Sequence, residues 1–173
     1  MPLKYLYAVP LILFVGCGDT QVNEPANTEK LSSLSPLGDL SETGDKPTIA
    51  HVNIVDLNQD GENDVLVCDV LGQRVSWINR GNEQTLLSEV SGAVHAETSD
   101  IDGDGDLDVL VSVMGTILPS DAHTGKVIIL ENDGNETFTP RIIAENIQRV
   151  TDVRGGDLDG DGDIDLSVAQ FGY

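Results

Sequence analysis

Basic residues are scarce in this 173-residue chain. Lysine and arginine together number 9, against 30 aspartate and glutamate residues, and the formal net charge is −21. Proteins that bind nucleic acid need basic patches, and electrostatic attachment to anionic lipid needs clusters of lysine and arginine. The composition therefore predicts no nucleic-acid partner and no electrostatic attachment to a membrane.

Cysteine and aromatic residues are also rare. The cysteines are Cys17 and Cys68, and aromatic residues make up 4% of the chain. Two cysteines can form one disulfide at most, and modification of Cys17 would leave Cys68 without a partner. Cys68 lies in an apolar run, where Ser112 and Ala169 hold the equivalent positions, so we expect a small buried residue rather than a reactive thiol. With neither disulfides nor many aromatic residues, the fold needs another source of stability.

An acidic nonapeptide occurs three times, at residues 56–64, 100–108 and 157–165. Each copy has oxygen-bearing side chains at positions 1, 3, 5 and 9 and glycine at position 6. Calcium takes about six to eight oxygen ligands, and glycine permits the sharp turn that such a loop needs. Fourteen of the 30 acidic residues lie in these loops, and charges this dense repel one another unless a cation lies among them. The pattern predicts three Ca²⁺ sites.

The loops are not EF-hands. An EF-hand has a glutamate at position 12 and a helix on each side, whereas position 12 here is Val67, Val111 or Val168. Each loop is followed by a short β-branched run that is typical of a strand. The nonapeptide therefore connects two strands.

The loops start 44 and 57 residues apart, a spacing typical of a β-propeller with one four-stranded blade per repeat. The longer interval comes mostly from a surface loop at 115–125. We expect strands near 49–55, 64–70, 73–79 and 84–90 in the first repeat, near 93–99, 108–114, 126–131 and 137–144 in the second, and near 149–156 and 165–170 in the third.

The predicted fold is an all-β propeller with calcium loops between the first and second strands of each blade. The sequence provides about two and a half blades, whereas closed propellers have about four to eight. Since an open end would expose unpaired edge strands, we expect a fragment of a longer protein. The alternative is a short chain that completes its propeller by assembly.

These repeats resemble the FG-GAP/VCBS family, the calcium-loop propeller blades that also occur in integrin α-subunits. The resemblance rests on the three acidic loops, the apolar strand after each, and Asn-x-Gly turns at 79–81 and 132–134, and it covers residues 49–173. It implies side-chain ligands at positions 1, 3, 5 and 9 and a backbone carbonyl ligand at position 7. The implied metal ligands are Asp56, Asn58, Asp60, Glu62, Asp64, Asp100, Asp102, Asp104, Asp106, Asp108, Asp157, Asp159, Asp161, Asp163 and Asp165. Because Asn58 is neutral, we expect the first site to be the weakest.

Residues 1–17 resemble a bacterial lipoprotein signal peptide. Lys4 precedes an apolar stretch at 5–15, and small Gly16 precedes Cys17, which would carry the lipid. The alternative is an ordinary signal peptide with a chance cysteine. Residues 18–47 are polar and without periodicity, which predicts a flexible tether.

The predicted domain order is therefore signal peptide, tether, and propeller repeats at 48–91, 92–148 and 149–173. We expect an exported protein that is lipid-anchored at the bacterial cell envelope. Gly18, rather than aspartate, follows the cysteine, which by resemblance to Gram-negative sorting favours the outer membrane.

His51 and His95 hold the same repeat position, and Asp152 is their equivalent in the third repeat. The strand that carries them would be innermost in a propeller, so the three side chains could line an axial channel as a ring that binds a second metal or a polar ligand. The alternative is that these positions are simply hydrated. His123, in the 115–125 loop, is expected to be solvated.

The sequence favours a binding or adhesion module whose ligand is a protein or a polysaccharide. The alternative is part of a propeller enzyme that resembles polysaccharide lyases. Lyase chemistry needs a base and cationic neutralisation of a uronate, and a chain with 3 histidines and 9 basic residues offers little for either.

Overall fold

The structure, a computed structural model, describes residues 47–79 and 83–172. The predicted signal peptide with Cys17, and all but the last residue of the predicted tether, lie outside the described residues. Every regular element in the described part of the chain is a β-strand, which confirms the all-β class. These residues include no helix that is long and apolar enough to span a membrane.

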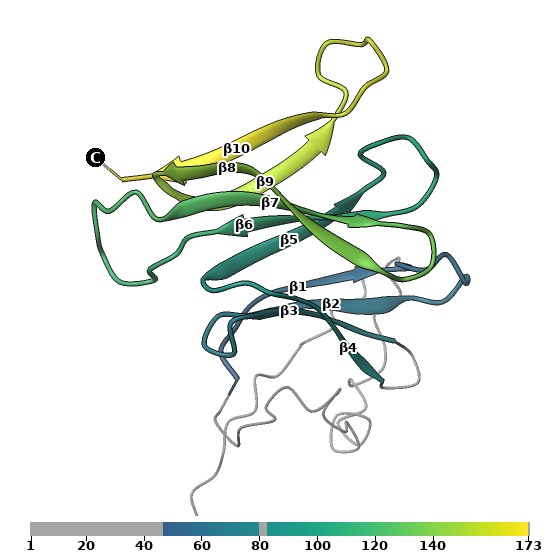
Figure 1. Ribbon diagram of the computed structural model, residues 1–173, viewed down its shortest axis with the longest axis horizontal. Helices are drawn as coiled ribbons and strands as arrows, with labels where there is room; N and C mark the ends of the chain where they lie inside the picture. Colours follow the sequence, from purple (N-terminus) through teal and green to yellow (C-terminus); the bar gives the residue numbers. More distant parts are fainter. Residues whose placement is uncertain (1–46, 80–82, 173) are drawn as a thin grey trace, which may run out of the picture. The chain divides into compact units, whose positions relative to one another are not determined.

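The strands form two four-stranded antiparallel sheets and one antiparallel pair, each in sequence order (Figure 1). The first sheet contains β1 (Ile49–Val55), β2 (Asp64–Asp69), β3 (Arg74–Ile78) and β4 (Gln84–Glu89). The second contains β5 (Ala93–Ser99), β6 (Asp108–Val113), β7 (Gly125–Asn132) and β8 (Phe138–Ile147). The pair consists of β9 (Arg149–Gly156) and β10 (Asp165–Phe171).

The strands lie where the sequence predicts them, with one four-stranded sheet for each of the first two repeats. The largest difference is at β8, which continues to Ile147 rather than ending near 144. Burial follows position in the sheet. All six residues of β6 are buried, whereas β8, at the edge of its sheet, is mostly exposed. A strand covered on both faces is expected to be apolar throughout, as the Val-Leu-Val run of β6 is.

Two apolar clusters hold the sheets together. The first joins residues of the first two sheets, among them Leu66, Trp77, Ala96 and Val111. The second joins the second sheet to the β9–β10 pair through residues such as Leu110, Ile129, Val150 and Val153. In addition, β5 lies against both β1 and β9. Successive repeats therefore pack face to face, with their first strands adjacent.

Cys68 lies in the first cluster with no solvent exposure, and its thiol is free. Burial raises the pKa of this thiol to about 12, so it stays protonated at neutral pH. The prediction that Cys68 is a small buried strand residue is confirmed.

The described residues do not form a closed ring of blades. They comprise two complete four-stranded sheets and the β9–β10 pair. The antiparallel repeat architecture is established, while the propeller and its blade number stay predictions. The three acidic loops connect β1 to β2, β5 to β6 and β9 to β10, and they project from the same end of their sheets (Figure 1).

Candidate metal sites

Strand register brings the two ends of each acidic loop together. Ser99, just before the second loop, pairs with Asp108 at its end, and Gly156 likewise pairs with Asp165 in the third repeat. In the first repeat Val55 pairs with Asp64. The antiparallel ladder therefore sets the aspartate at position 9 beside the aspartate at position 1.

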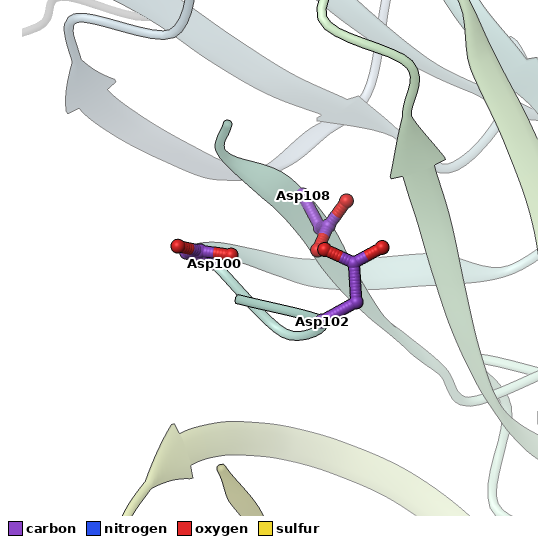
Figure 2. Close-up of side chains that lie close together, drawn as sticks. All are labelled: Asp100, Asp102 and Asp108. Carbon is purple, nitrogen blue, oxygen red and sulfur yellow. The ribbon is translucent and has the colours of Figure 1, made fainter. Parts of the chain in front are cut away.

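In the second loop three carboxylates converge. Asp100, Asp102 and Asp108 each offer one oxygen, and these oxygens all lie within 4.8 Å of one another. Figure 2 shows the Asp102 and Asp108 carboxylates side by side, with Asp100 across the loop from them. Clustered carboxylate oxygens are the ligands that a hard cation such as Ca²⁺ prefers, so the donor set fits this ion.

The third loop repeats this arrangement. Asp157, Asp159 and Asp165 bring one oxygen each within the same 4.8 Å limit. Asp165 is only half-buried, whereas its counterpart Asp108 is 2% exposed. The same donor set therefore occurs in two consecutive repeats, and it is more exposed to solvent in the third.

Hydrogen bonds wind the second and third loops around their first aspartate. The carboxylate of Asp100 accepts bonds from the N–H groups of Gly103 and Gly105, at 2.8 and 3.1 Å. Asp157 accepts the equivalent bonds from the glycines at positions 4 and 6 of the third loop. Gly103 and Gly105 have φ angles of 77° and 100°, a region that other residues rarely occupy. The glycines thus allow the tight turn that gathers the carboxylates.

The aspartate at position 9 is buried and fixed by backbone donors. Asp108 accepts bonds from the N–H groups of Ile101 and Asn132, each at 2.9 Å. Burial raises the pKa of Asp108, and the two backbone hydrogen bonds oppose that shift. Asp64 in the first loop accepts one such bond, from the N–H of Leu57 at 3.2 Å, and burial raises its pKa as well. A bound cation would relieve the cost of keeping either carboxylate ionised.

The first loop is built differently. Asn58 and Gln59 stand where the other loops have Asp-Gly, and Gln59 takes the positive φ of 59° that glycine takes elsewhere. The Gln59 side-chain amide donates to the Gly105 carbonyl at 2.7 Å, and that of Asn58 donates to the Glu136 carboxylate at 3.2 Å. Within the described ranges, groups of three converging acidic side chains occur in the second and third loops and not in this one. The first loop instead contacts the second repeat, so the prediction of a weaker metal site there stays a prediction.

The structure also brings His51, His95 and Asp152 together, from β1, β5 and β9. The two imidazole ring centroids are 4.1 Å apart, and His95 Nε2 lies 3.0 Å from Asp152 Oδ1. Arg154 pairs with both Asp152 and Glu97. The sequence places Glu97 and Arg154 at equivalent repeat positions two residues further along, but it gives no sign that they pair. His123 lies exposed in the loop between β6 and β7.

The fold and the loops define an all-β repeat protein with aspartate-rich turns between the first two strands of each repeat. A sequence model of the FG-GAP-like repeat matches residues 56–111 and 100–168. These matches span more than half of the chain, which therefore belongs to the FG-GAP-like repeat family, whose repeats often bind calcium. No curated protein matches the chain.

Proposed function

We propose that this chain is part of a calcium-stabilised β-propeller that serves as a binding or adhesion module, lipid-anchored at the bacterial cell envelope. The convergence of three carboxylates in the second loop, repeated in the third, is the observation that carries the proposal. Family membership supports it, because FG-GAP repeats are associated with propeller-like binding modules. The ligand would be a protein or a polysaccharide, and three loops would hold up to three calcium ions.

Calcium would act here as a structural ion. Each loop closes the turn between two strands with carboxylates that repel one another, so the folded state gains more from a dication than the unfolded chain does. An ion present at a hundred times its dissociation constant, and bound by the folded state alone, contributes about 2.7 kcal/mol per site. Such a contribution suits a domain that has few aromatic residues and a free buried cysteine in place of a disulfide.

The loop between β6 and β7 is the best candidate for contacts with a ligand. Ile117 and Leu118 are 51% and 70% exposed, and the Leu118 carbonyl accepts a hydrogen bond of 3.0 Å from the guanidinium of Arg149. The loop therefore presents two large apolar side chains from a tethered backbone. Binding residues commonly lie on loops that a rigid scaffold positions in this way.

Thermal unfolding tests the role of calcium. Full-length protein should melt at a clearly higher temperature in Ca²⁺ than in EGTA, and Mg²⁺ should give less stabilisation because it demands a tighter octahedral site. Asp102→Asn and Asp159→Asn should each reduce the calcium-dependent shift. Asp121→Asn, an exposed acidic residue outside the loops, is the matched control and should leave the shift unchanged. Equal melting temperatures in Ca²⁺ and EGTA would refute the proposal.

Attachment to the membrane is tested separately. Expressed with its own signal peptide in a Gram-negative host, the protein should incorporate labelled fatty acid and fractionate with the outer membrane. Cys17→Ser should abolish both properties, and Cys68→Ser should abolish neither. Labelling that survives Cys17→Ser would contradict the anchor, without bearing on the calcium sites.

Ligand binding is tested by sedimentation with purified envelope polysaccharide in Ca²⁺. Replacing Leu118 by serine should weaken co-sedimentation if this loop makes the contact. If wild-type protein and variant bind equally, the loop is not the contact site. If neither binds, the polysaccharide ligand is rejected.

A further inference from the structure

We propose that the β6–β7 loop and the end of β10 form a docking surface for a protein segment in which a carboxylate stands beside apolar side chains. The carboxylate would bind Arg149, the first residue of β9. This inference rests on the proposed role of the chain as a binding module, and it gives the chemistry of the ligand at the loop where contact is expected. Because β6 and β10 both begin at acidic loops, their other ends place this surface at the opposite end of the sheets (Figure 1).

Arg149 differs from the other basic residues that the structure describes. Arg74, Lys126, Arg141 and Arg154 each form an ion pair with a carboxylate. Arg149 is 8% exposed, and in the described part of the chain it has no such partner, although the protein carries 30 acidic residues. A charge that is buried without a counter-charge is strongly destabilising. The guanidinium of Arg149 therefore calls for an anion.

The contacts of this guanidinium leave one edge unused. Its Nη1 atom donates to the Leu118 carbonyl at 3.0 Å, and its Cζ atom lies over the Phe171 ring, 4.0 Å from the centroid. Its Nε atom is buried and has no hydrogen-bond partner among the described residues. An arginine that stacks on an aromatic face can still donate in its own plane to a carboxylate. A ligand carboxylate at the Nε edge would satisfy both the charge and the donor.

Phe171 covers the guanidinium in the ligand-free protein. It lies directly opposite Arg149 in the β9–β10 ladder, as the last residue of β10. The residue is 45% exposed, so its ring has solvent on one side. A ligand would reach Nε when this ring turns outward, and rotamer changes of this kind are common when protein surfaces bind.

The apolar side chains beside Arg149 favour a protein partner over a polysaccharide. Leu118 and its neighbour Ile117 are 70% and 51% exposed, and with Phe171 they present three large apolar groups on the segments that Arg149 holds. Exposed apolar groups that gather in this way mark protein contacts, whereas a sugar presents mainly hydroxyl groups. An acidic residue flanked by apolar residues would match both the charge and the apolar groups.

Titration of the full-length protein in Ca²⁺ with two short peptides tests the proposal. One is N-acetyl-leucyl-glutamyl-leucine amide, and the other has glutaminyl in place of glutamyl, which keeps the shape and removes the charge. Wild-type protein should bind the acidic peptide at least about tenfold more tightly, because hydrogen bonds to charged groups are the stronger ones. In protein that carries isotope-labelled arginine, the Nε–H signal of Arg149 should shift with the acidic peptide and not with the neutral one.

Variants separate the charge from the apolar contact. Arg149→Gln should remove the difference between the two peptides, and Leu118→Ser should weaken the binding of both. The matched controls are Arg141→Gln and Leu71→Ser, which alter side chains that are 48% exposed on β8 and 63% exposed between β2 and β3. Both controls should bind as the wild type does. Because Leu118 is largely exposed, its variant keeps the test decisive if Arg149→Gln fails to fold.

Equal affinity of the wild type for the two peptides, or no binding of either, would overturn the proposal. A difference that survives Arg149→Gln, or unchanged binding in Leu118→Ser, would do the same. Glucuronate that binds as tightly as the acidic peptide and displaces it would overturn the choice of a protein partner in favour of an acidic polysaccharide. None of these results affects the comparison of melting in Ca²⁺ and EGTA, so failure of the docking surface is distinguishable from failure of the calcium-stabilised scaffold.

Discussion

The first and second acidic loops share one nine-residue pattern and use it differently. Both loops wind around their first aspartate, Asp56 or Asp100, by accepting backbone hydrogen bonds. The second does so through glycines at positions 4 and 6 and gathers three carboxylates. The first has Asn58 and Gln59 at positions 3 and 4, and both side chains reach the second repeat. The difference teaches that a repeated acidic loop can exchange a carboxylate for a contact between neighbouring repeats.

Placing glutamine rather than glycine at position 4 of the first loop has a conformational cost. A residue other than glycine at positive φ, such as Gln59 at 59°, costs about 1 kcal/mol or more. The hydrogen bond that Gln59 donates to Gly105 contributes about 0.5–1.5 kcal/mol. Strain and contact therefore nearly cancel. The hydrogen bond also connects the two loops, because the Gln59 side chain of the first loop binds the Gly105 carbonyl of the second.

The largest effect is expected when the aspartate at position 9 is replaced, and the loss of stability should differ between the two loops. Asp108→Ala leaves the N–H groups of Ile101 and Asn132 without their acceptor. Asp64→Ala leaves one backbone donor, that of Leu57, and also removes a weaker interaction with the Trp77 side chain. A buried donor left unpaired costs about 1–3 kcal/mol, so Asp108→Ala should lower the free energy of unfolding by about 3 kcal/mol and Asp64→Ala by roughly half as much. Urea unfolding in EGTA measures both without a contribution from calcium.

The control for this comparison is Asp108→Asn, which keeps one acceptor oxygen and removes the charge. It should destabilise the calcium-free protein less than alanine does, because burial already disfavours the charged form of Asp108. Losses of equal size for Asp108→Ala and Asp64→Ala would show that the additional bond to Asn132 does not distinguish the loops.

A smaller effect is expected when the first loop is made more like the others. Asn58→Asp restores a carboxylate at position 3, and one more charged ligand should raise the calcium affinity of this loop by about tenfold, or about 1.4 kcal/mol. Calorimetric titration should show the gain at one site of the three. In EGTA the variant should be slightly less stable than the wild type, since the new carboxylate would face the Glu136 carboxylate in place of the amide donor.

The opposite substitution in the second loop, Asp102→Asn, is the matched control. It should lower the affinity of that loop by a similar factor. An unchanged titration for Asn58→Asp would mean that a carboxylate at position 3 does not determine the calcium affinity of this loop. The backbone conformation of the first loop would then determine it.

Much of this architecture follows from sequence because the signals are local. The β-branched runs and the spacing of the repeats give the position of every described strand, and the aspartate pattern gives the loops. The equivalence of His51, His95 and Asp152 predicts a shared face, and the structure brings their side chains together.

Contacts between repeats could not be predicted in the same way. That Gln59 reaches Gly105 depends on how two sheets pack, and no spacing within one repeat encodes it. The pairing of Arg154 with Glu97 has the same origin, since β5 and β9 are adjacent only after folding. Sequence periodicity therefore locates the acidic side chains of each repeat but not the contacts between repeats.

The smallest expected effect tests the link between the first two loops. Gln59→Gly relieves the strain at positive φ and removes the hydrogen bond to Gly105, so the free energy of unfolding should change by less than about 1 kcal/mol. Gln59→Ala removes the bond but keeps the strain, and it should be about 1 kcal/mol less stable than the glycine variant. If calcium binding to the second loop weakens in both variants, the loss comes from the missing contact rather than from the backbone of the first loop. Equal stability of the two variants would show that position 59 carries no strain, and the first loop would then differ from the second in its contacts and its side-chain charge but not in backbone strain.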